Sequence, residues 1–185
     1  MLDEIIGYIK NPTFQEDPNT DTRYRLRFLV IATFFGISIS IGLSLVAGIL
    51  ESLFKLELGK HAMDDLFENF SAVGILFFAV IVAPVLEELL FRGPIVWFKN
   101  SAYFKTIFYL VALLFGYIHI TNFELSTTVL LLSPLLVAPQ ISVGLLLGMV
   151  RVKFGLLWSM GMHALYNFIL ASPLIAMKLL DIPIA

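Results

Sequence analysis

The sequence contains no cysteine among its 185 residues. Disulfide bonds, thiolate metal sites and a cysteine nucleophile are therefore excluded. Charged residues are also scarce: they make up 14% of the chain, against about 25% in typical soluble domains. The net charge of -2 provides no basic face, so we expect no nucleic-acid partner.

Apolar residues are abundant instead, at 59% of the chain, and the mean hydropathy is +0.92. A folded domain of roughly 150 residues hides only about 70% of its surface. Because so apolar a chain cannot bury all of its apolar side chains, lipid must cover the rest. The composition predicts an integral membrane protein, an all-α polytopic bundle of about five to six transmembrane helices with a buried polar site.

Five apolar segments approach the length of about 20 residues that a helix needs to cross a membrane. They cover residues 28–50, 72–98, 103–120, 127–150 and 154–171. Pro134 and Pro139 remove backbone donors from the fourth segment, which predicts a kink or a break there. The tail 173–180 is too short for a full span, and we expect a short interfacial or re-entrant piece.

The domain organisation is simple. We expect an N-terminal segment over 1–27 and a single membrane domain over 28–185, with a core at about 72–171. The apolar run that begins at Phe28 is longer than the core of a signal peptide, so we interpret it as a retained anchor. The acidic stretch 51–70, with Asp64 and Asp65 among apolar residues, predicts an amphipathic element on the outer surface.

Lysine and arginine are distributed unevenly between the two sides that five spans would create, and cytoplasmic loops carry the excess of these residues. One side holds Lys10, Arg23, Arg25, Arg27, Arg92, Lys99, Lys105, Arg151 and Lys153, and the other holds Lys55, Lys60 and Lys178. We therefore expect a cytoplasmic N-terminus and an external C-terminus, in the plasma membrane of a bacterium.

Ionisable residues interrupt the apolar segments. Each charge costs roughly 2.5 to 3.5 kcal/mol at the centre of a membrane helix, so the cluster Glu87, Glu88 and Arg92 requires an explanation. Lys99, Lys105 and Lys153 mark the cytoplasmic interface of the three segments. At 1.5 Å of rise per residue, Glu87, His119 and His163 lie about 18, 21 and 15 Å from these lysines. This agreement predicts one shared site near mid-membrane. The alternative is isolated histidines that each bond a nearby carbonyl.

Helical spacing distinguishes the two carboxylates. Residues at i and i+4 share a face, so Glu88 can pair with Arg92 while Glu87 points elsewhere and remains free to act as a base. The pair could equally serve only to hold helices together. His163 and Asn167 also share a face. Phe115 shares one with His119, either as an apolar wall beside the imidazole or as ordinary core packing.

These groups suit the hydrolysis of a peptide bond. A carboxylate and an imidazole can take a proton from water, and an imidazole and an amide can donate to an oxyanion. The same atoms, Glu87, His119 and His163, form a plausible catalytic zinc set, and spacing alone does not separate the two possibilities. The sequence has no His-Glu-x-x-His zinc helix and no Gly-x-Ser-x-Gly elbow.

Three ordered motifs then stand out: Glu87-Glu88-x-x-x-Arg92, Phe115-x-x-x-His119 and His163-x-x-x-Asn167. Together they resemble the motifs of the CPBP family, the CAAX protease and bacteriocin-processing intramembrane proteases also called Abi proteins, over about residues 83 to 168. The resemblance implies an all-helical intramembrane endopeptidase. In that family Glu87 and His119 would activate water, His163 and Asn167 would form the oxyanion hole, and Glu88 and Arg92 would support them.

The resemblance leaves the cofactor open. The family is often labelled metalloprotease, but we favour a metal-free glutamate mechanism because helical phase leaves Glu87 free as a base, with zinc as the alternative. The substrate would be a peptide or protein in or at the lipid bilayer, in bacteriocin maturation, self-immunity or the trimming of prenylated proteins. The chain is shorter than the eukaryotic CAAX endopeptidases, which leaves prenylation of the substrate undecided.

Two other classes of function use the same residues. A non-catalytic binding or immunity protein could hold a peptide with the polar cluster and leave it intact. A small transporter could use the acids and histidines as a proton relay, although no pair of interrupted half-helices indicates the inverted repeats of that class.

Overall fold

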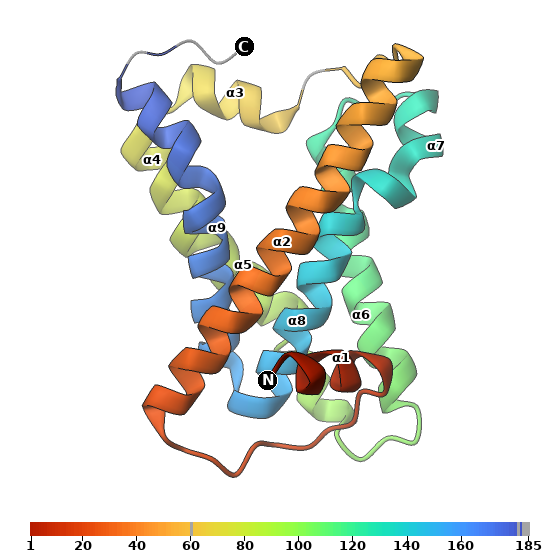
Figure 1. The fold of residues 1–185 in the computed structure, drawn as a ribbon, viewed down its shortest axis with the longest axis vertical. Helices are drawn as coiled ribbons and strands as arrows, with labels where there is room; N and C mark the ends of the chain where they lie inside the picture. The colour runs from red at the N-terminus through yellow and green to blue at the C-terminus, as the bar shows by residue number, and fades with distance from the viewer. Residues whose placement is uncertain (60, 181, 183–185) are drawn as a thin grey trace.

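The computed structural model describes residues 1–59, 61–180 and 182, and in these residues the chain is helical apart from turns, loops and one isolated bridge between His61 and Phe123. Five helices are long and apolar enough to cross a membrane. The predicted all-α polytopic bundle is thus confirmed (Figure 1). Lys60, the side chains of 63–65, Asp181 and residues 183–185 lie outside the description, and the expectation for Asp64 and Asp65 falls on these side chains.

The five spans are assembled from both long helices and shorter pieces. The first is α2 (Thr22–Phe54), the third joins α6 (Phe104–Ile118) to a 3-10 turn (His119–Asn122), and the fifth is α9 (Leu156–Leu179). The second, Ala72–Phe98, consists of α4 (Ala72–Phe77), a π-helix (Phe78–Val82), α5 (Ala83–Phe91) and a 3-10 turn (Pro94–Phe98). The fourth contains α7 (Thr127–Leu136) and α8 (Ala138–Phe154). Two short helices, α1 (Leu2–Lys10) and α3 (Ala62–Asn69), lie outside the spans.

The predicted break in the fourth span is present: α7 ends and α8 begins on either side of Val137. The expectation for the tail was wrong, because α9 continues through Pro173 to Leu179. Helical proline is tolerated in membrane proteins where neighbouring elements satisfy the backbone. Here Ala171 and Ile175 pack against α4, and the ammonium of Lys178 donates to the carbonyl of Phe67, so tertiary contacts continue the helix.

The first span begins earlier than the sequence predicted. Asp21 caps α2, accepting hydrogen bonds from the backbone N–H groups of Arg23 and Tyr24. Such a cap offsets unpaired donors at a helix start and is worth about 1 kcal/mol. The boundary expected at residue 27 therefore falls inside α2.

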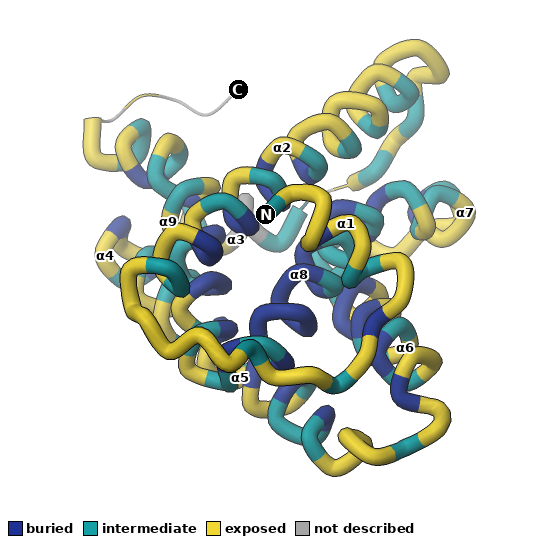
Figure 2. The backbone as a smooth tube through the Cα atoms, turned by 60° about the horizontal axis from the view of Figure 1, so that its bottom comes forward, coloured by how far each residue is buried: buried dark blue, intermediate teal, exposed yellow. Residues whose placement is uncertain are grey.

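Helix α8 forms the centre of the bundle and packs against α2, α6 and α9. Figure 2 shows it largely buried, whereas the second half of α2 is mostly exposed. Small residues allow the close approach of α6 and α8, as is common between membrane helices. A Cβ on Gly116 would lie 2.2 Å from Ile141 Cγ1, and one on Gly148 would lie 2.8 Å from Phe108 Cε2.

The N-terminal residues pack on the end of the bundle. Ile5 of α1 is fully buried, and the hydroxyl of Tyr109 donates to the carbonyl of Ile9 at 2.7 Å. Lys153, at the end of α8, pairs with Glu4 at 2.7 Å and Asp17 at 3.2 Å. These contacts bring the N-terminus, the start of α6 and the α8–α9 turn to one end of the bundle (Figure 1), as five spans require.

The Asp17 contacts predict a pH-dependent contribution to stability. Burial raises the pKa of Asp17, but hydrogen bonds from the Asn19 backbone N–H and the side chains of Lys153 and Tyr24 outweigh it, so the pKa lies below its usual value. The stabilisation is therefore present above the unfolded pKa, about 3.9, and is lost as the pH falls through the lower folded pKa. We expect Asp17→Asn to lower the midpoint of thermal unfolding in detergent at pH 6. The difference from the unmodified protein should shrink near pH 3, and an equal difference at both values would contradict the assignment.

The close contact of α6 and α8 yields a second prediction. Gly116→Ala should destabilise the protein by about 1–3 kcal/mol, the usual cost of overpacking, because the new methyl group meets Ile141. Gly42→Ala is the matched control, since a Cβ at Gly42 has no atom within 4 Å. Unfolding in mixed detergent micelles measures both. Equal stability of the two variants would contradict the close packing.

Candidate active site

The two adjacent glutamates project from α5, which follows directly on the π-helix Phe78–Val82. A π-turn adds a residue to the helix and so rotates everything after it, and such turns are frequent at functional sites. The amide Nδ2 of Asn167 on α9 donates to the carbonyl of Ala79 inside this π-helix at 2.8 Å. The contact joins the third sequence motif to the segment that carries the first.

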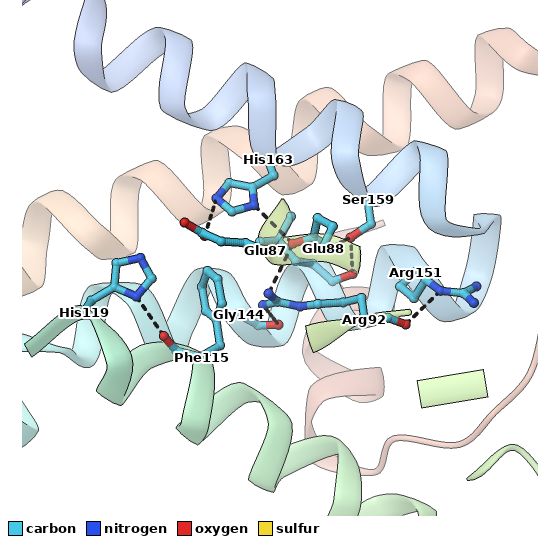
Figure 3. A network of polar contacts seen from close by, with 10 residues as sticks. Glu87, Glu88, Arg92, Phe115, His119, Gly144, Arg151, Ser159 and His163 are labelled. Carbon is cyan, nitrogen blue, oxygen red and sulfur yellow. Dashed lines mark hydrogen bonds and ion pairs between the residues drawn. The ribbon is translucent and has the colours of Figure 1, made fainter. Parts of the chain in front are cut away.

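Glu88 lies at the centre of a buried polar network (Figure 3). Its Oε1 is 3.2 Å from Nη1 of Arg92 and 3.1 Å from Nδ1 of His163. Its Oε2 accepts a short hydrogen bond from the hydroxyl of Ser159. The ion pair of Glu88 with Arg92 that helical spacing predicted is therefore present, and both side chains are fully buried.

Arg92 has further partners that hold its guanidinium in place. Nη2 donates to the carbonyl of Gly144 on α8 at 3.2 Å, and the guanidinium carbon lies 3.8 Å from the centre of the Phe115 ring. Stacking of this kind contributes about 2 kcal/mol when water is excluded. A Cβ on Gly144 would lie 3.0 Å from the Phe115 ring and 3.3 Å from Nη2 of Arg92, so the glycine makes room for both.

Glu87 differs from its neighbour in both exposure and contacts. Its side chain is 29% exposed, against 0% for Glu88. Glu87 Oε2 is itself buried, has no hydrogen-bond partner among the described residues, and lies 3.7 Å from Nε2 of His163. A buried carboxylate oxygen without a hydrogen-bond partner is costly. Catalytic groups are among the few buried polar groups that lack such a partner.

His119 terminates α6 and lies beside this network (Figure 3). Its ring centre is 4.9 Å from that of Phe115, which is in turn 5.7 Å from that of His163. The Nδ1 atom of His119 is 2.8 Å from the carbonyl of Phe115. A carbonyl only accepts, so Nδ1 carries the proton and Nε2 of the neutral ring has a free lone pair.

The structure thus brings Glu87, Glu88, Arg92, Phe115 and His163 into one contiguous cluster, with His119 at its edge. Three details differ from the sequence-based expectation. His163 bonds Glu88 as well as facing Glu87. The sequence left open that each histidine only bonds a nearby carbonyl group; this is so for Nδ1 of His119 but not for His163. The side-chain amide of Asn167 bonds the backbone carbonyl of Ala79.

Sequence reasoning missed Ser159 and Gly144. Ser159 precedes His163 by four residues and so lies one turn away on the same face of α9. That spacing was a usable signal, because a lone hydroxyl on the face of a membrane helix that carries an imidazole is available to the same partner. No sequence pattern indicated Gly144, because its role is to leave space for the Phe115 ring and the Arg92 guanidinium.

We tested the zinc alternative against the donor positions. No three His, Asp or Glu side chains of the described residues are grouped closely enough to hold a metal ion. Glu87 and His163 face each other, but Nδ1 of His163 is bonded to Glu88, and His119 stands apart across Phe115. The arrangement does not fit the set Glu87, His119 and His163, and we derive no step through a metal.

A cavity of about 630 Å³ lies between α2, the start of α8 and α9. Its lining includes Ser40, Ser44 and Gly48 on α2 and Tyr166 on α9, but none of the two glutamates or two histidines of the site. The hydroxyl of Tyr166 donates to Ser40 at 2.8 Å. The cavity therefore touches α9, the helix that carries the third motif, but is not lined by the polar cluster.

The sequence model of the family described as type II CAAX prenyl endopeptidase Rce1-like matches residues 69–169. The chain belongs to this family. The match covers more than half of the chain and includes every residue of the three motifs, which confirms the resemblance to the CPBP proteases. No curated protein and no solved structure matches the chain.

Membership defines the general role. The family is one of membrane-embedded CAAX-type proteases, so the chain is an integral membrane protein of a protease family, whose members act on membrane-associated peptides or proteins. The matched region begins just before α4, and α1 and α2 lie outside it. The matched region includes α5, α6, α8 and the first part of α9, and so every residue of the polar cluster.

The buried ion pair gives a prediction for stability. Arg92→Met should destabilise the protein by about 3–5 kcal/mol, because Glu88 is left as an uncompensated buried charge. The double variant Glu88→Gln with Arg92→Met should recover part of this loss, since neither charge then remains. Thermal unfolding in detergent measures the cycle, and strictly additive effects of the two substitutions would contradict direct coupling.

Proposed function

We propose that this protein is an intramembrane endopeptidase in which Glu87 and His119 activate water and His163 and Asn167 stabilise the oxyanion. The main support is the contrast between the two glutamates. Glu88 has arginine, serine and histidine partners, whereas Glu87 Oε2 is buried without a hydrogen-bond partner and lies 3.7 Å from Nε2 of His163. A carboxylate oxygen without a hydrogen-bond partner is available to accept a proton from water.

The tautomer of His119 supports its role beside Glu87. Because Nδ1 donates to the Phe115 carbonyl, the lone pair of Nε2 can accept a hydrogen bond from the attacking water. A similar carbonyl or carboxylate partner orients catalytic histidines in unrelated enzymes. His119 and Glu87 approach the substrate from different helices, α6 and α5.

The oxyanion would be stabilised from α9. Nδ1 of His163 lies 3.1 Å from Glu88, so Nε2 is the ring atom that, when protonated, would donate to the oxyanion. Asn167 uses one amide proton on Ala79 and has another to donate. Preorganised donors of this kind are worth about 10²–10³ in rate.

The reaction then follows the usual sequence of acyl transfer to water. Glu87 takes a proton as the water oxygen attacks the scissile carbonyl carbon, and the carbonyl oxygen becomes the oxyanion beside His163 and Asn167. The tetrahedral species collapses with cleavage of the C–N bond, and the leaving amine takes the proton held by Glu87. The products are a carboxylic acid and an amine, and no covalent enzyme intermediate forms.

The substrate is a membrane-associated peptide or protein, cut for CAAX-type trimming, bacteriocin-related processing or self-immunity. The cavity between α2 and α9 offers an apolar space next to Asn167 for the adjoining part of the substrate. The membrane domain, which begins with α2, would lie in a bacterial plasma membrane, with the N-terminus and the basic end of the bundle in the cytoplasm.

Glu87→Gln is the decisive substitution. It keeps the shape of the side chain but removes the base, so cleavage should fall by at least about 10²–10⁴-fold, the usual contribution of a general base. The assay uses purified protein in detergent and a library of quenched-fluorescent peptides. Glu68→Gln is the matched control, because Glu68 is exposed on α3, and it should leave turnover unchanged.

Unchanged turnover of the Glu87→Gln variant, with its unfolding midpoint retained, would exclude Glu87 as the base. Recovery of intact peptide after prolonged binding to the unmodified protein would instead favour the binding or immunity class of function.

A further inference from the structure

We propose that Ser159 is a positioning residue that fixes the Glu88 carboxylate and, through it, the ring of His163. The catalytic consequence rests on the proposed function, whereas the positioning itself does not. Ser159 lies on α9 one turn before His163, and its side chain is fully buried. Buried polar residues are few among the described residues, and two of them on α9, Ser159 and His163, both bond Glu88.

The direction of the Ser159 hydroxyl differs from that of several other hydroxyls in the same bundle. Thr33, Ser38 and Ser172 each donate to the carbonyl four residues earlier in their own helix. This is the default for hydroxyls in membrane helices, because it satisfies the donor locally. Ser159 instead reaches across to Glu88 on α5 and lies 2.9 Å from the carbonyl of Leu147 on α8. Its hydroxyl is therefore used for a contact between helices.

The contact determines how the Glu88 carboxylate is turned. The terminal torsion of glutamate is soft, so a single partner does not fix the plane of the carboxylate. Oε1 is occupied by Arg92 and His163, and Oε2 is bound by Ser159. Because partners contact both oxygens, the carboxylate presents Oε1 to Nδ1 of His163 in one orientation.

The orientation of Glu88 in turn selects the nitrogen that His163 offers to the reaction. A carboxylate on Nδ1 keeps a proton there and directs Nε2 outward, as in the second-partner arrangements that orient histidines elsewhere. In this protein Nε2 faces Glu87 at 3.7 Å. Without Ser159 the carboxylate can rotate, and the ring of His163 loses the partner that sets its tautomer and its direction.

The first arm of the test is kinetic. Ser159→Ala should lower kcat by about 10-fold to 100-fold, the range for loss of a group that orients a histidine partner, with KM changed less than twofold because Ser159 does not touch substrate. Ser159→Cys has nearly the same volume but a weak donor, so it should show the same loss without a cavity. Ser172→Ala, on the exposed side of α9, is the control and should keep full turnover. The probe is the library peptide that the unmodified protein cleaves fastest.

The second arm requires no activity. The chain has three histidines, so nitrogen-15 NMR of the labelled imidazoles in detergent gives few signals, and His163→Gln assigns those of His163. The unmodified protein should show a protonated Nδ1 at His163. Ser159→Ala and Ser159→Cys should give a mixture of tautomers or broadened signals, while Ser172→Ala should reproduce the original spectrum.

The two arms separate the two proposals. Unaltered His163 signals in both Ser159 variants would overturn the positioning role, whether or not kcat falls. Altered signals with an unchanged kcat would overturn the catalytic consequence of the positioning, because the orientation of His163 would then not matter for the reaction. If no peptide is cleaved by the unmodified protein, the peptidase function fails, and the NMR result alone decides whether Ser159 positions His163.

Discussion

The ion pair of Glu88 with Arg92 is the interaction on which the site depends. Two opposite charges with no exposed surface, one turn apart in an apolar helix, are tolerated only with further partners. Those partners come from every side: Ser159 and His163 from α9, Gly144 from α8 and the Phe115 ring from α6. The need to satisfy this pair therefore ties three other helices to α5 and sets the distances between them.

The close packing of α8 makes these contacts possible. Glycine at 144 leaves room for the arginine and the phenylalanine ring, and glycine at 116 lets α6 approach Ile141. Lipid tails are as apolar as the side chains they would replace, so association in a membrane relies on close contact and hydrogen bonds rather than on the hydrophobic effect. The buried polar network and the small residues at the α6–α8 contact are two parts of one arrangement.

Glu87 and Glu88 are adjacent in the sequence, but their carboxylates have different surroundings. Glu88 faces the interior and is held on both oxygens, whereas Glu87, about 100° further round the helix, is partly exposed and keeps one oxygen without a partner. In the proposed reaction, stability and reactivity are thereby assigned to separate residues. A single glutamate could not both neutralise a buried arginine and remain free to accept a proton.

Much of this protein followed from its sequence alone. Apolar segments of membrane-spanning length determine the five spans because a lipid bilayer leaves the backbone no alternative to helices, and the i to i+4 spacing determines the Glu88–Arg92 pair because it depends only on helical geometry. Other features arise between helices and leave no local pattern. The continuation of α9 past Pro173 needs the packing of Ile175 on α4, and the π-turn that receives Asn167 needs α9 beside it. The link from Ser159 to Glu88 joins residues 71 positions apart, and only the tertiary structure could decide it, because the partner of a hydroxyl in an apolar environment is whichever acceptor packing brings within reach.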